Sequence, residues 1–387
     1  MSWPIPTFRK IELPAPIALR VWLPALTAMA LGMAGAVLLL WPHGKSTHGL
    51  QFWGLLIGIP LVTCVIALGV RLDRWEHEQT IAEEAQREQE RIMSLWRSWS
   101  RRQVCVEASV AILPIHVPAA KLGDVDADLP VNMGRASAFD WSKNKALELR
   151  RAKLLGQIAD ALRTPLTSRK EMRVRLLLAD ASAESLRDWK AAAQDALGKI
   201  APDCKFSVDI ERAGDCASFL TQQVDLVGAA PQLVIAAQLW PDDETKQTFS
   251  EGAAALLIEP AGGRAGHVFR PMTAAANTLE AALQQLVHMQ ISPDRITHTW
   301  FTRCEAESGA ITSALISDPK ARLIERHFDH ITGEPGPATS WIALATALEA
   351  SHESGPQVVA WREPDDESLS NACSDAGFTI GRTHCVS

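Results

Sequence analysis

VWLPALTAMALGMAGAVLLLW (Val21–Trp41) and LQFWGLLIGIPLVTCVIALGV (Leu50–Val70) are two apolar runs that contain no charged residue. Each is long enough to cross a hydrocarbon core of roughly 30 Å as a helix that rises about 1.5 Å per residue. Tryptophans stand near the ends of the runs, where amphipathic rings favour the membrane interface. A pair of buried core helices in a soluble protein is the alternative, and the absence of charge from both runs disfavours it. The sequence therefore predicts a transmembrane hairpin over residues 21–70, in contact with a lipid bilayer.

The lysines and arginines around this hairpin predict its orientation, because these residues are enriched on the cytoplasmic side. The connecting loop, Pro42–Gly49, carries Lys45 as its one full charge. The basic residues beyond the two runs are Arg9, Lys10 and Arg20 before the hairpin, and Arg71, Arg74, Arg87 and Arg91 after it. We expect a multi-pass protein of the inner (cytoplasmic) membrane. Its N-terminus, residues 1–20, is cytoplasmic, and its soluble domain faces the cytoplasm.

Processing and redox patterns agree with this location. A cleaved signal peptide fits badly, because the first run is too long and a second run follows at once. The seven cysteines include no CxxC pair, which is typical of free thiols in a reducing compartment.

A helical stem is expected over Arg71–Arg102, which lacks Gly and Pro and is rich in Glu, Gln, Arg and Ala. Its apolar residues fall on one arc of the helix, and its acidic and basic residues are interspersed. We interpret residues 71–102 as a connector packed on the soluble domain. A coiled coil that makes a homodimer is the alternative, although the apolar repeat is not sustained.

Strands that alternate with helices predict a layered α/β domain over residues 103–387, with no visible internal repeat. The expected strands are Val104–Ile115, Val174–Ala179, Lys205–Ile210, Gln232–Leu239 and the buried Ala253–Glu259. The expected helices are Ala146–Arg163, Ser182–Ile200, Asn277–Gln290 and Trp341–Ala350.

Known chemical motifs are absent from the sequence. There is no GxxxxGK[ST], GxSxG or HExxH motif and no zinc-type cysteine cluster, and the net charge of −7 without a basic stripe argues against nucleic acid. Gly262–Gly266 lacks dinucleotide spacing and is interpreted as a turn. His327 and His330 are expected to be surface or capping residues and not metal ligands. The side chains of His384 and Cys385 should point apart. We therefore name no catalytic, cofactor-binding or metal-binding residue, and expect no cofactor.

Three segments in the C-terminal third resemble β-ketoacyl synthases of the thiolase-like superfamily. Phe249–Glu259 is similar to the family's GEGA segment and the apolar strand that follows it. Ile291–Ile296 resembles a helix-to-strand connection, and Gly333–Ser340 resembles the Gly-His-x-x-x-Ala-x-Gly turn. The resemblance covers roughly residues 225–380 and implies a layered thiolase-like fold.

The resemblance also implies a cysteine nucleophile and two histidines, and the chain departs from this pattern. Trp300–Arg303 stands where the first histidine is expected, while His298 comes too early and should lie within a strand. Glu334 stands at the second histidine position.

The nucleophile is also missing. The family's spacing places it near Leu178–Ser182, which contains no cysteine. Cys204 and Cys216 lie too close to Gly252 to fit that spacing.

Three functions remain in view. The favoured one is a membrane-anchored, non-catalytic thiolase-like module that binds a protein partner. The layout resembles adaptor proteins of type VI secretion lipases, which implies an adaptor or accessory of a bacterial secretion system. The second is a divergent acyl-transfer or condensing enzyme that acts on acyl thioesters at the membrane. The third is a structural membrane component whose stem oligomerises.

Overall fold

The computed structural model describes residues 3–42, 45–179, 183–226, 228, 230–242, 247–291, 295–316, 323–362 and 378–384. The chain divides into two compact units. One unit is Ile5–Trp96, and the other combines Met1–Pro4 with Arg97–Ser387.

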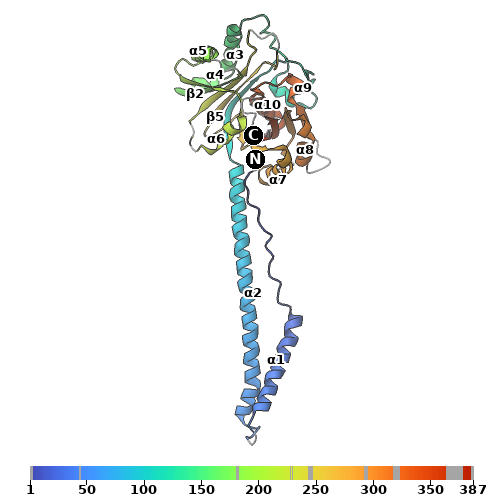
Figure 1. Cartoon of the computed structure of the whole chain (residues 1–387). Coiled ribbons are helices and arrows are strands. Elements are labelled where there is room, and N and C mark those ends of the chain that lie inside the picture. The colour runs from blue at the N-terminus through green and yellow to red at the C-terminus, as the bar shows by residue number, and fades with distance from the viewer. Residues whose placement is uncertain are drawn as a thin grey trace. The chain divides into compact units, whose positions relative to one another are not determined.

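Two apolar helices lie side by side in the unit Ile5–Trp96 (Figure 1). Helix α1 spans Leu19–Leu40, and helix α2 spans Leu50–Ser100. The Sγ of Cys64 lies 3.5 Å from the carbonyl oxygen of Leu26, which joins the two helices. Both helices are long and apolar enough to cross a membrane by length and composition. Many of their apolar side chains are exposed in this unit. Insertion of the two helices into a membrane stays a prediction.

Helix α2 continues from its apolar segment into the charged stem without a break. The sequence divides these segments at residue 70, but no Gly or Pro follows Gly69 before the helix ends, so the backbone has no local reason to leave the helix. Neighbouring charges along the stem form ion pairs, with Arg91 to Glu88 at 2.6 Å and Arg87 to Glu83 at 3.4 Å. The hydrogen bond from Arg91 lowers the pKa of Glu88.

One mixed sheet forms the centre of the other unit. Its strands are β1 (Gln103–Ile112), β2 (Glu171–Leu178), β3 (Lys205–Arg212), β4 (Gln232–Gln238), β5 (Gly252–Glu259), β6 (Gly266–Phe269), β7 (Met272–Ala274), β8 (His298–Thr302), β9 (Ile324–His327), β10 (Gln357–Arg362) and β11 (Phe378–His384). Among the described residues the order is β3-β2-β4-β5-β1-β6-β11-β10-β8-β9, with β7 paired to β11.

This order reads as two copies of one topology that meet at the antiparallel pair β1–β6. In the first half, β2 lies parallel to β3 and β4, and β5 lies antiparallel to β4 and β1. In the second half, β8 lies parallel to β9 and β10, and β11 lies antiparallel to β10 and β6. The structure therefore contains a duplication that the sequence does not display.

The helices follow the same duplication. Helices α3 (Leu147–Ala161), α5 (Ala183–Ile200) and α6 (Cys216–Asp225) connect strands of the first half as α7 (Leu279–Met289), α8 (Glu305–Leu315) and α10 (Thr339–Ser354) connect strands of the second. Shorter elements are η1 (Ala119–Gly123), α4 (Arg163–Thr167), η2 (Ala276–Thr278) and α9 (Phe328–Thr332).

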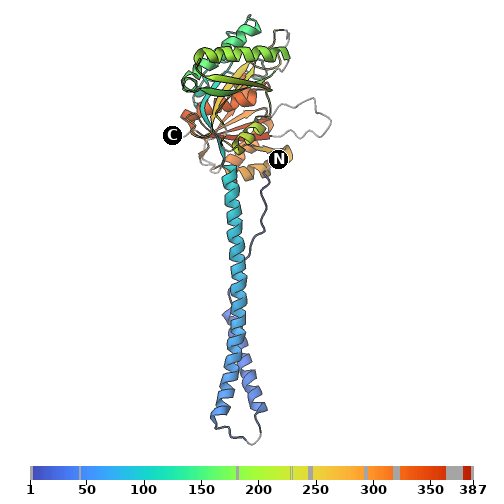
Figure 2. The same cartoon turned by 90° about the vertical axis from the view of Figure 1, so that its left-hand side faces the viewer.

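The helices and the sheet are arranged in layers (Figure 2). Two clusters of buried hydrophobic residues lie between these layers. Helices α3 and α5 pack on one face of the first half-sheet. Helices α6 and α10 form the middle layer, and α10 contacts β1 and β5 of the first half as well as β8, β10 and β11 of the second. Helices α7 and α8 contact strands of the second half. The predicted layered α/β architecture is confirmed.

The strongest elements of the sequence are found where they were expected. The predicted strand Ala253–Glu259 lies within β5, between β4 and β1, and is buried until its last residue. Helices α6 and α8 and strands β6, β7, β9, β10 and β11 were not predicted from the sequence.

Aromatic and ionic contacts hold the end of α2 on the domain. The ring of Trp3 meets that of Trp99 edge-on, with centroids 5.7 Å apart, and Trp3 is buried. The guanidinium of Arg270 lies 3.9 Å from the Trp99 ring centroid and pairs with Asp225. Gln290 donates to the carbonyl oxygen of Ser100 at 2.6 Å. These contacts place Trp3 and the last turn of α2 in one packed group.

We predict that Leu257→Asp unfolds the domain. Leu257 is fully buried in β5, so the substitution places an unpaired carboxyl group in the core at a cost of several kcal/mol, against a stability of about 5–15 kcal/mol for an ordinary domain. The measurement is urea denaturation of the full chain in detergent. The control is Leu149→Asp, because Leu149 is 61% exposed on α3. An unchanged midpoint for Leu257→Asp would show that β5 is not buried as described.

Candidate functional site

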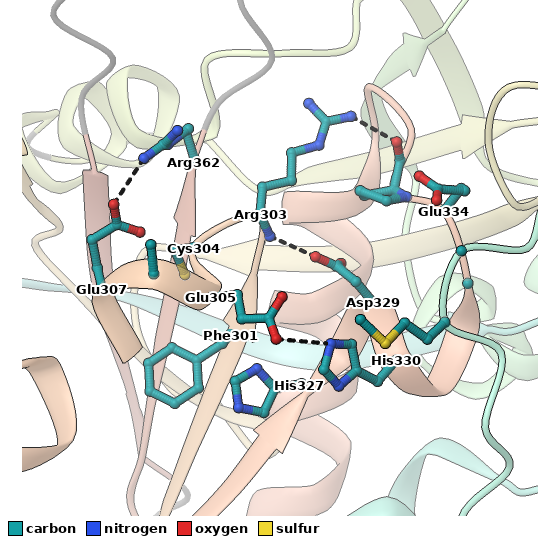
Figure 3. A pocket seen from close by; sticks show the side chains of 15 residues that line it. Phe301, Arg303, Cys304, Glu305, Glu307, His327, Asp329, His330, Glu334 and Arg362 are labelled. Carbon is teal, nitrogen blue, oxygen red and sulfur yellow. Dashed lines mark hydrogen bonds and ion pairs between the residues drawn. The ribbon is translucent and has the colours of Figure 1, made fainter. Parts of the chain in front are cut away.

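A pocket of about 660 Å³ lies at the carboxyl ends of the parallel strands β8, β9 and β10 (Figure 3). Phe301 and Arg303 come from β8 and the turn after it, His327 ends β9, and Arg362 ends β10. Crevices beyond the carboxyl ends of strands are where open α/β sheets bind ligands. This pocket is therefore the candidate site.

The turn after β8 is fixed by the half-buried carboxylate of Asp329. Arg303 has a φ of +56°, which is unusual for a residue with a side chain. Its backbone N–H donates to Oδ2 of Asp329 at 2.6 Å, and Thr302 donates to the same carboxyl group. Burial raises the pKa of Asp329. The Arg303 guanidinium donates to the carbonyl oxygen of Pro335 at 2.7 Å, so both groups hold the wall of the pocket.

Three neighbouring rings line the pocket. The rings of Phe301 and His327 have centroids 5.3 Å apart, and those of His327 and His330 stack at 4.9 Å. The Nε2 of His330 lies 3.6 Å from Oε1 of Glu305. The two histidines are half-buried pocket residues, and His327 stands at the N-cap position of α9, where its side chain makes no capping hydrogen bond. Among the described residues no group of three ligating side chains could hold a metal ion.

Cys304 is the one cysteine among the described residues that line the pocket. It precedes α8, is 1% exposed, and lies with its Sγ 3.3 Å from the carbonyl oxygen of Ala360. Burial raises the pKa of this thiol to about 12. Only about one part in 10⁵ is then thiolate at neutral pH, and the thiolate is the nucleophilic form. Cys304 therefore lacks the activation that acyl transfer requires.

The turn that resembles the ketosynthase motif forms the opposite rim. Gly333 has a φ of +96°, and a Cβ there would collide with the carbonyl oxygen of Arg135. The Glu334 N–H donates to that same oxygen at 3.0 Å, and its carbonyl oxygen accepts from the N–H of Ser250 at 2.7 Å. The side chain of Glu334 is exposed at the pocket. Main-chain contacts thus fix the turn while its carboxylate stays in solvent.

Gln238, at the end of β4, ties this turn to the first half. Its side-chain Nε2 donates to the carbonyl oxygen of Ser250 at 2.7 Å, and its Oε1 accepts from the N–H of Ala338 at 2.9 Å. Gly336 packs so closely on Gln238 that a Cβ would overlap the amide group. This contact could not be predicted from the sequence, because the two segments are far apart in the chain.

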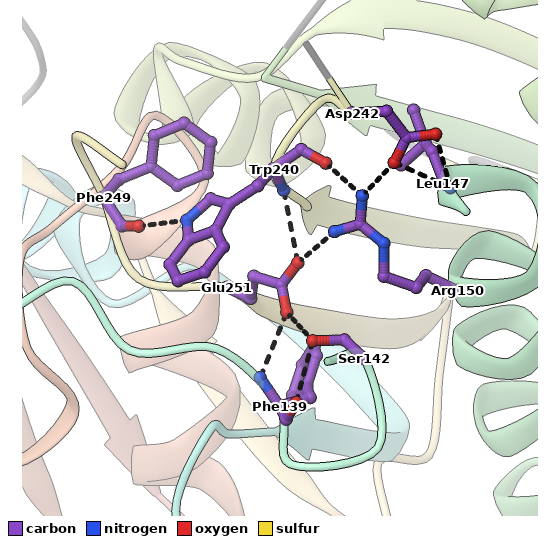
Figure 4. A network of polar contacts seen from close by, with 8 residues as sticks. All are labelled: Phe139, Ser142, Leu147, Arg150, Trp240, Asp242, Phe249 and Glu251. Atoms are coloured by element: carbon purple, nitrogen blue, oxygen red, sulfur yellow. Dashed lines mark hydrogen bonds and ion pairs between the residues drawn. The ribbon is translucent and has the colours of Figure 1, made fainter. Parts of the chain in front are cut away.

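Glu251 of the GEGA-like segment is the hub of a buried polar network (Figure 4). Its fully buried carboxylate accepts from Arg150 and from Ser142, both at 2.7 Å, and from the Phe139 N–H at 3.0 Å. Arg150 also bonds Asp242 at 2.7 Å. The pKa of Asp242 is lowered, first by its hydrogen bond from the Leu147 N–H and then by Arg150. With its partners satisfied in this way, Glu251 has a structural role.

The other residues singled out from the sequence are not brought together. His298 is the first residue of β8, as expected, and bonds the carbonyl oxygen of Gly123 through Nε2 at 2.7 Å. Burial lowers its pKa. Cys216 begins α6 and is fully buried, and Cys204 is buried with a pKa raised by desolvation.

Further segments that the sequence analysis singled out lie away from the pocket or outside the described residues. Gly262–Gly266 forms a turn, with the Gly266 N–H bonded to the Gly263 carbonyl oxygen at 3.0 Å, and no helix follows it. Cys385, residues 180–182 of the expected nucleophile segment and residues 292–294 of the expected connection lie outside the described residues.

Comparison with known proteins gives similarity of structure only. No family model and no curated protein sequence matches the chain. A ketosynthase domain from Streptomyces albus is 12% identical with a TM-score of 0.46, covering 74% of this chain and 96% of that one. The 3-oxoacyl-[acyl-carrier-protein] synthase III of Aquifex aeolicus is 12% identical with a TM-score of 0.41, covering 73% and 99%.

A third similar structure is the peroxisomal 3-ketoacyl-CoA thiolase of Saccharomyces cerevisiae, at 12% identity and a TM-score of 0.43, covering 73% of this chain and 97% of that one. That thiolase is described as a five-layered structure built from two core domains of identical topology. These proteins are of the class that the sequence resemblance named, and they assign no activity to this chain.

We predict that Glu251→Gln destabilises the protein by about 3 kcal/mol, because it leaves the buried Arg150 with less compensating charge. Chemical denaturation of the full chain measures the change. Glu148→Gln is the matched control, since Glu148 is exposed in the first turn of α3 and its loss should change stability by less than about 0.5 kcal/mol. Equal stabilities for the two variants would contradict the structural role of Glu251.

Proposed function

We propose that this chain is a membrane-anchored protein whose thiolase-like domain performs no acyl transfer and binds a protein partner. The single observation that carries the proposal is the state of the pocket. Its one described cysteine is buried with a pKa raised to about 12, and Asp329 and Arg303 are engaged in fixing the turn after β8. The resemblance implies histidines at Trp300–Arg303 and at Glu334, and neither place supplies one.

The duplicated topology supports the thiolase-like assignment from this chain's own residues. Each half has the same strand order and the same placing of its three connecting helices. The GEGA-like segment leads into β5, and the Gly333–Ser340 turn leads into α10, in the order that the sequence resemblance implies. Fold and chemistry are separable, because a fold does not by itself carry a function.

The membrane anchor rests on composition and exposure. Side chains of α1 and α2 such as Leu39 and Leu50 are 83% and 92% exposed, a state that favours a lipid environment over water. The basic residues on both flanks favour a cytoplasmic location for both ends. The burial of Trp3 against Trp99 supports placing the N-terminal residues and the domain on one side of the membrane.

The narrower form of the proposal is an adaptor or accessory of a bacterial secretion system, in which the partner is an effector or a component of the apparatus. It rests on the overall layout alone, an N-terminal hairpin followed by a thiolase-like domain. Identification of the bound partner is what would test this form.

A second candidate function is acyl transfer through Cys216. The thiol stands at the first position of α6, and a helix N-terminus stabilises a thiolate. Against this stands its complete burial. The two functions can therefore be told apart, because only acyl transfer through Cys216 forms a covalent acyl adduct on the protein.

We predict that the full chain in detergent gains no mass when incubated with acetyl-CoA or lauroyl-CoA and examined by intact-protein mass spectrometry. Cys304 is buried with a raised pKa and Cys216 is fully buried, so neither thiol is available to attack a thioester at a useful rate. The variants Cys304→Ser and Cys216→Ser serve as probes, and Cys204→Ser is the matched control. An acyl adduct that disappears only in Cys216→Ser or only in Cys304→Ser would replace the binding function with an enzymatic one.

A further inference from the structure

The charge balance of the pocket is negative. Its lining includes four carboxyl groups and two guanidinium groups. Arg362 pairs with Glu307 at 3.0 Å, and the guanidinium of Arg303 donates to the Pro335 carbonyl oxygen. Both positive groups are therefore engaged with the protein itself.

Two of the carboxylates face solvent at the rim. The side chain of Glu305 is 66% exposed and has His330 at 3.6 Å, and Glu334 is exposed on the opposite side. Within the described part of the chain, no hydrogen bond or ion pair of the Glu334 carboxylate is observed. Deeper in, Oε2 of Glu307 is buried and has no hydrogen-bond partner among the described residues. Its other oxygen pairs with Arg362, so Glu307 adds no free charge to the site.

Beside Glu305 the pocket is lined by three flat rings (Figure 3). Phe301, His327 and His330 follow one another at 5.3 and 4.9 Å between centroids. A cation is attracted to the face of an aromatic ring, and a planar guanidinium also stacks on it. Met133, which is 57% exposed, adds an apolar surface at the pocket on which an aliphatic stem can pack.

The whole chain has a matching charge. Its net charge of −7 favours encounter with a basic partner. The pocket, at about 660 Å³, has room for more than the head group of one side chain, so it can also admit the segment that carries the side chain.

We propose that the pocket binds a basic side chain, arginine or lysine, presented by a polypeptide segment of the partner protein. This inference rests on the proposed binding function and names the chemistry of the partner. The charged head lies beside the carboxylate of Glu305 and the ring of His330. The carboxylate of Glu334 adds its charge from the opposite rim, and the aliphatic stem packs near Met133.

The test is fluorescence anisotropy of the full chain in detergent with three fluorescein-labelled nonapeptides of glycine and serine. Their central residue is arginine, lysine or citrulline, which has the shape of arginine without its charge. We expect the arginine peptide to bind at least tenfold more tightly than the citrulline peptide. The double variant Glu305→Gln/Glu334→Gln should reduce that preference about tenfold, and the control Glu280→Gln, an exposed residue of α7, should not.

Equal binding of the arginine and citrulline peptides, or a preference that survives in the double variant, would overturn this proposal. Such a result is distinguishable from failure of the proposed function, which the acyl-adduct measurement decides without reference to peptides. If the chain forms no adduct and does not prefer arginine, only the inference of a basic side chain is overturned, and the proposed function stands.

Discussion

Burial of the middle layer is the constraint on which the rest of this domain depends. Helix α10 contacts strands of both half-sheets, so nearly all of its surface must be apolar and small. Its alanines meet that requirement: Ala343, Ala345, Ala347 and Ala350 are at most 1% exposed. Short side chains let backbone layers approach closely, and each buried methyl group adds to the hydrophobic stabilisation. The contact of Trp341 with Phe219, at 5.1 Å between ring centroids, joins α10 to its counterpart α6 in the same layer.

Buried polar groups join the two halves of the domain at one end of this layer. Gln238 and Glu251 satisfy backbone groups where the halves meet, and their partners come from distant segments. A buried carboxylate with several donors is stable only while all of them remain in place. The same burial that stabilises the layer leaves Cys216 and Cys304 without solvent contact. Carboxylate, amide and thiol groups, which act in catalysis in other proteins, are thus buried here within the fold.

Local pattern was sufficient to predict the strongest elements. The apolar run Ala253–Glu259 and the alanine-rich segment Trp341–Ala350 could each be recognised from their own residues. A continuous run of this kind indicates a buried strand or helix without information from distant parts of the chain. Helix α6 was missed since it has only ten residues. Its N-cap is Asp215, whose positive φ and hydrogen bond from the Ser218 N–H are visible only in three dimensions. The second half-sheet was largely missed because its strands are short.

The candidate site, like the fold, could be predicted only in part from the sequence. The absence of histidine near Arg303 and at Glu334 could be seen in the sequence, but the pairing of Glu251 with Arg150 joins residues 101 positions apart. The ring stack of Phe301, His327 and His330 likewise arises from the meeting of β8, β9 and α9. The duplication lies in strand order, which constrains direction and pairing and leaves residue identity free. No pattern along one chain could reveal it.

Binding without acyl transfer is the central claim, and site-specific photo-crosslinking tests it most directly. Benzoylphenylalanine replaces Met133 at the pocket, or Leu149 on α3 as a control of similar exposure, in cells that make the protein. Irradiation should yield one discrete protein adduct at position 133 that is absent at position 149. No adduct at position 133 beyond that at position 149, or crosslinking to an acyl carrier protein charged with an acyl chain, would contradict the claim.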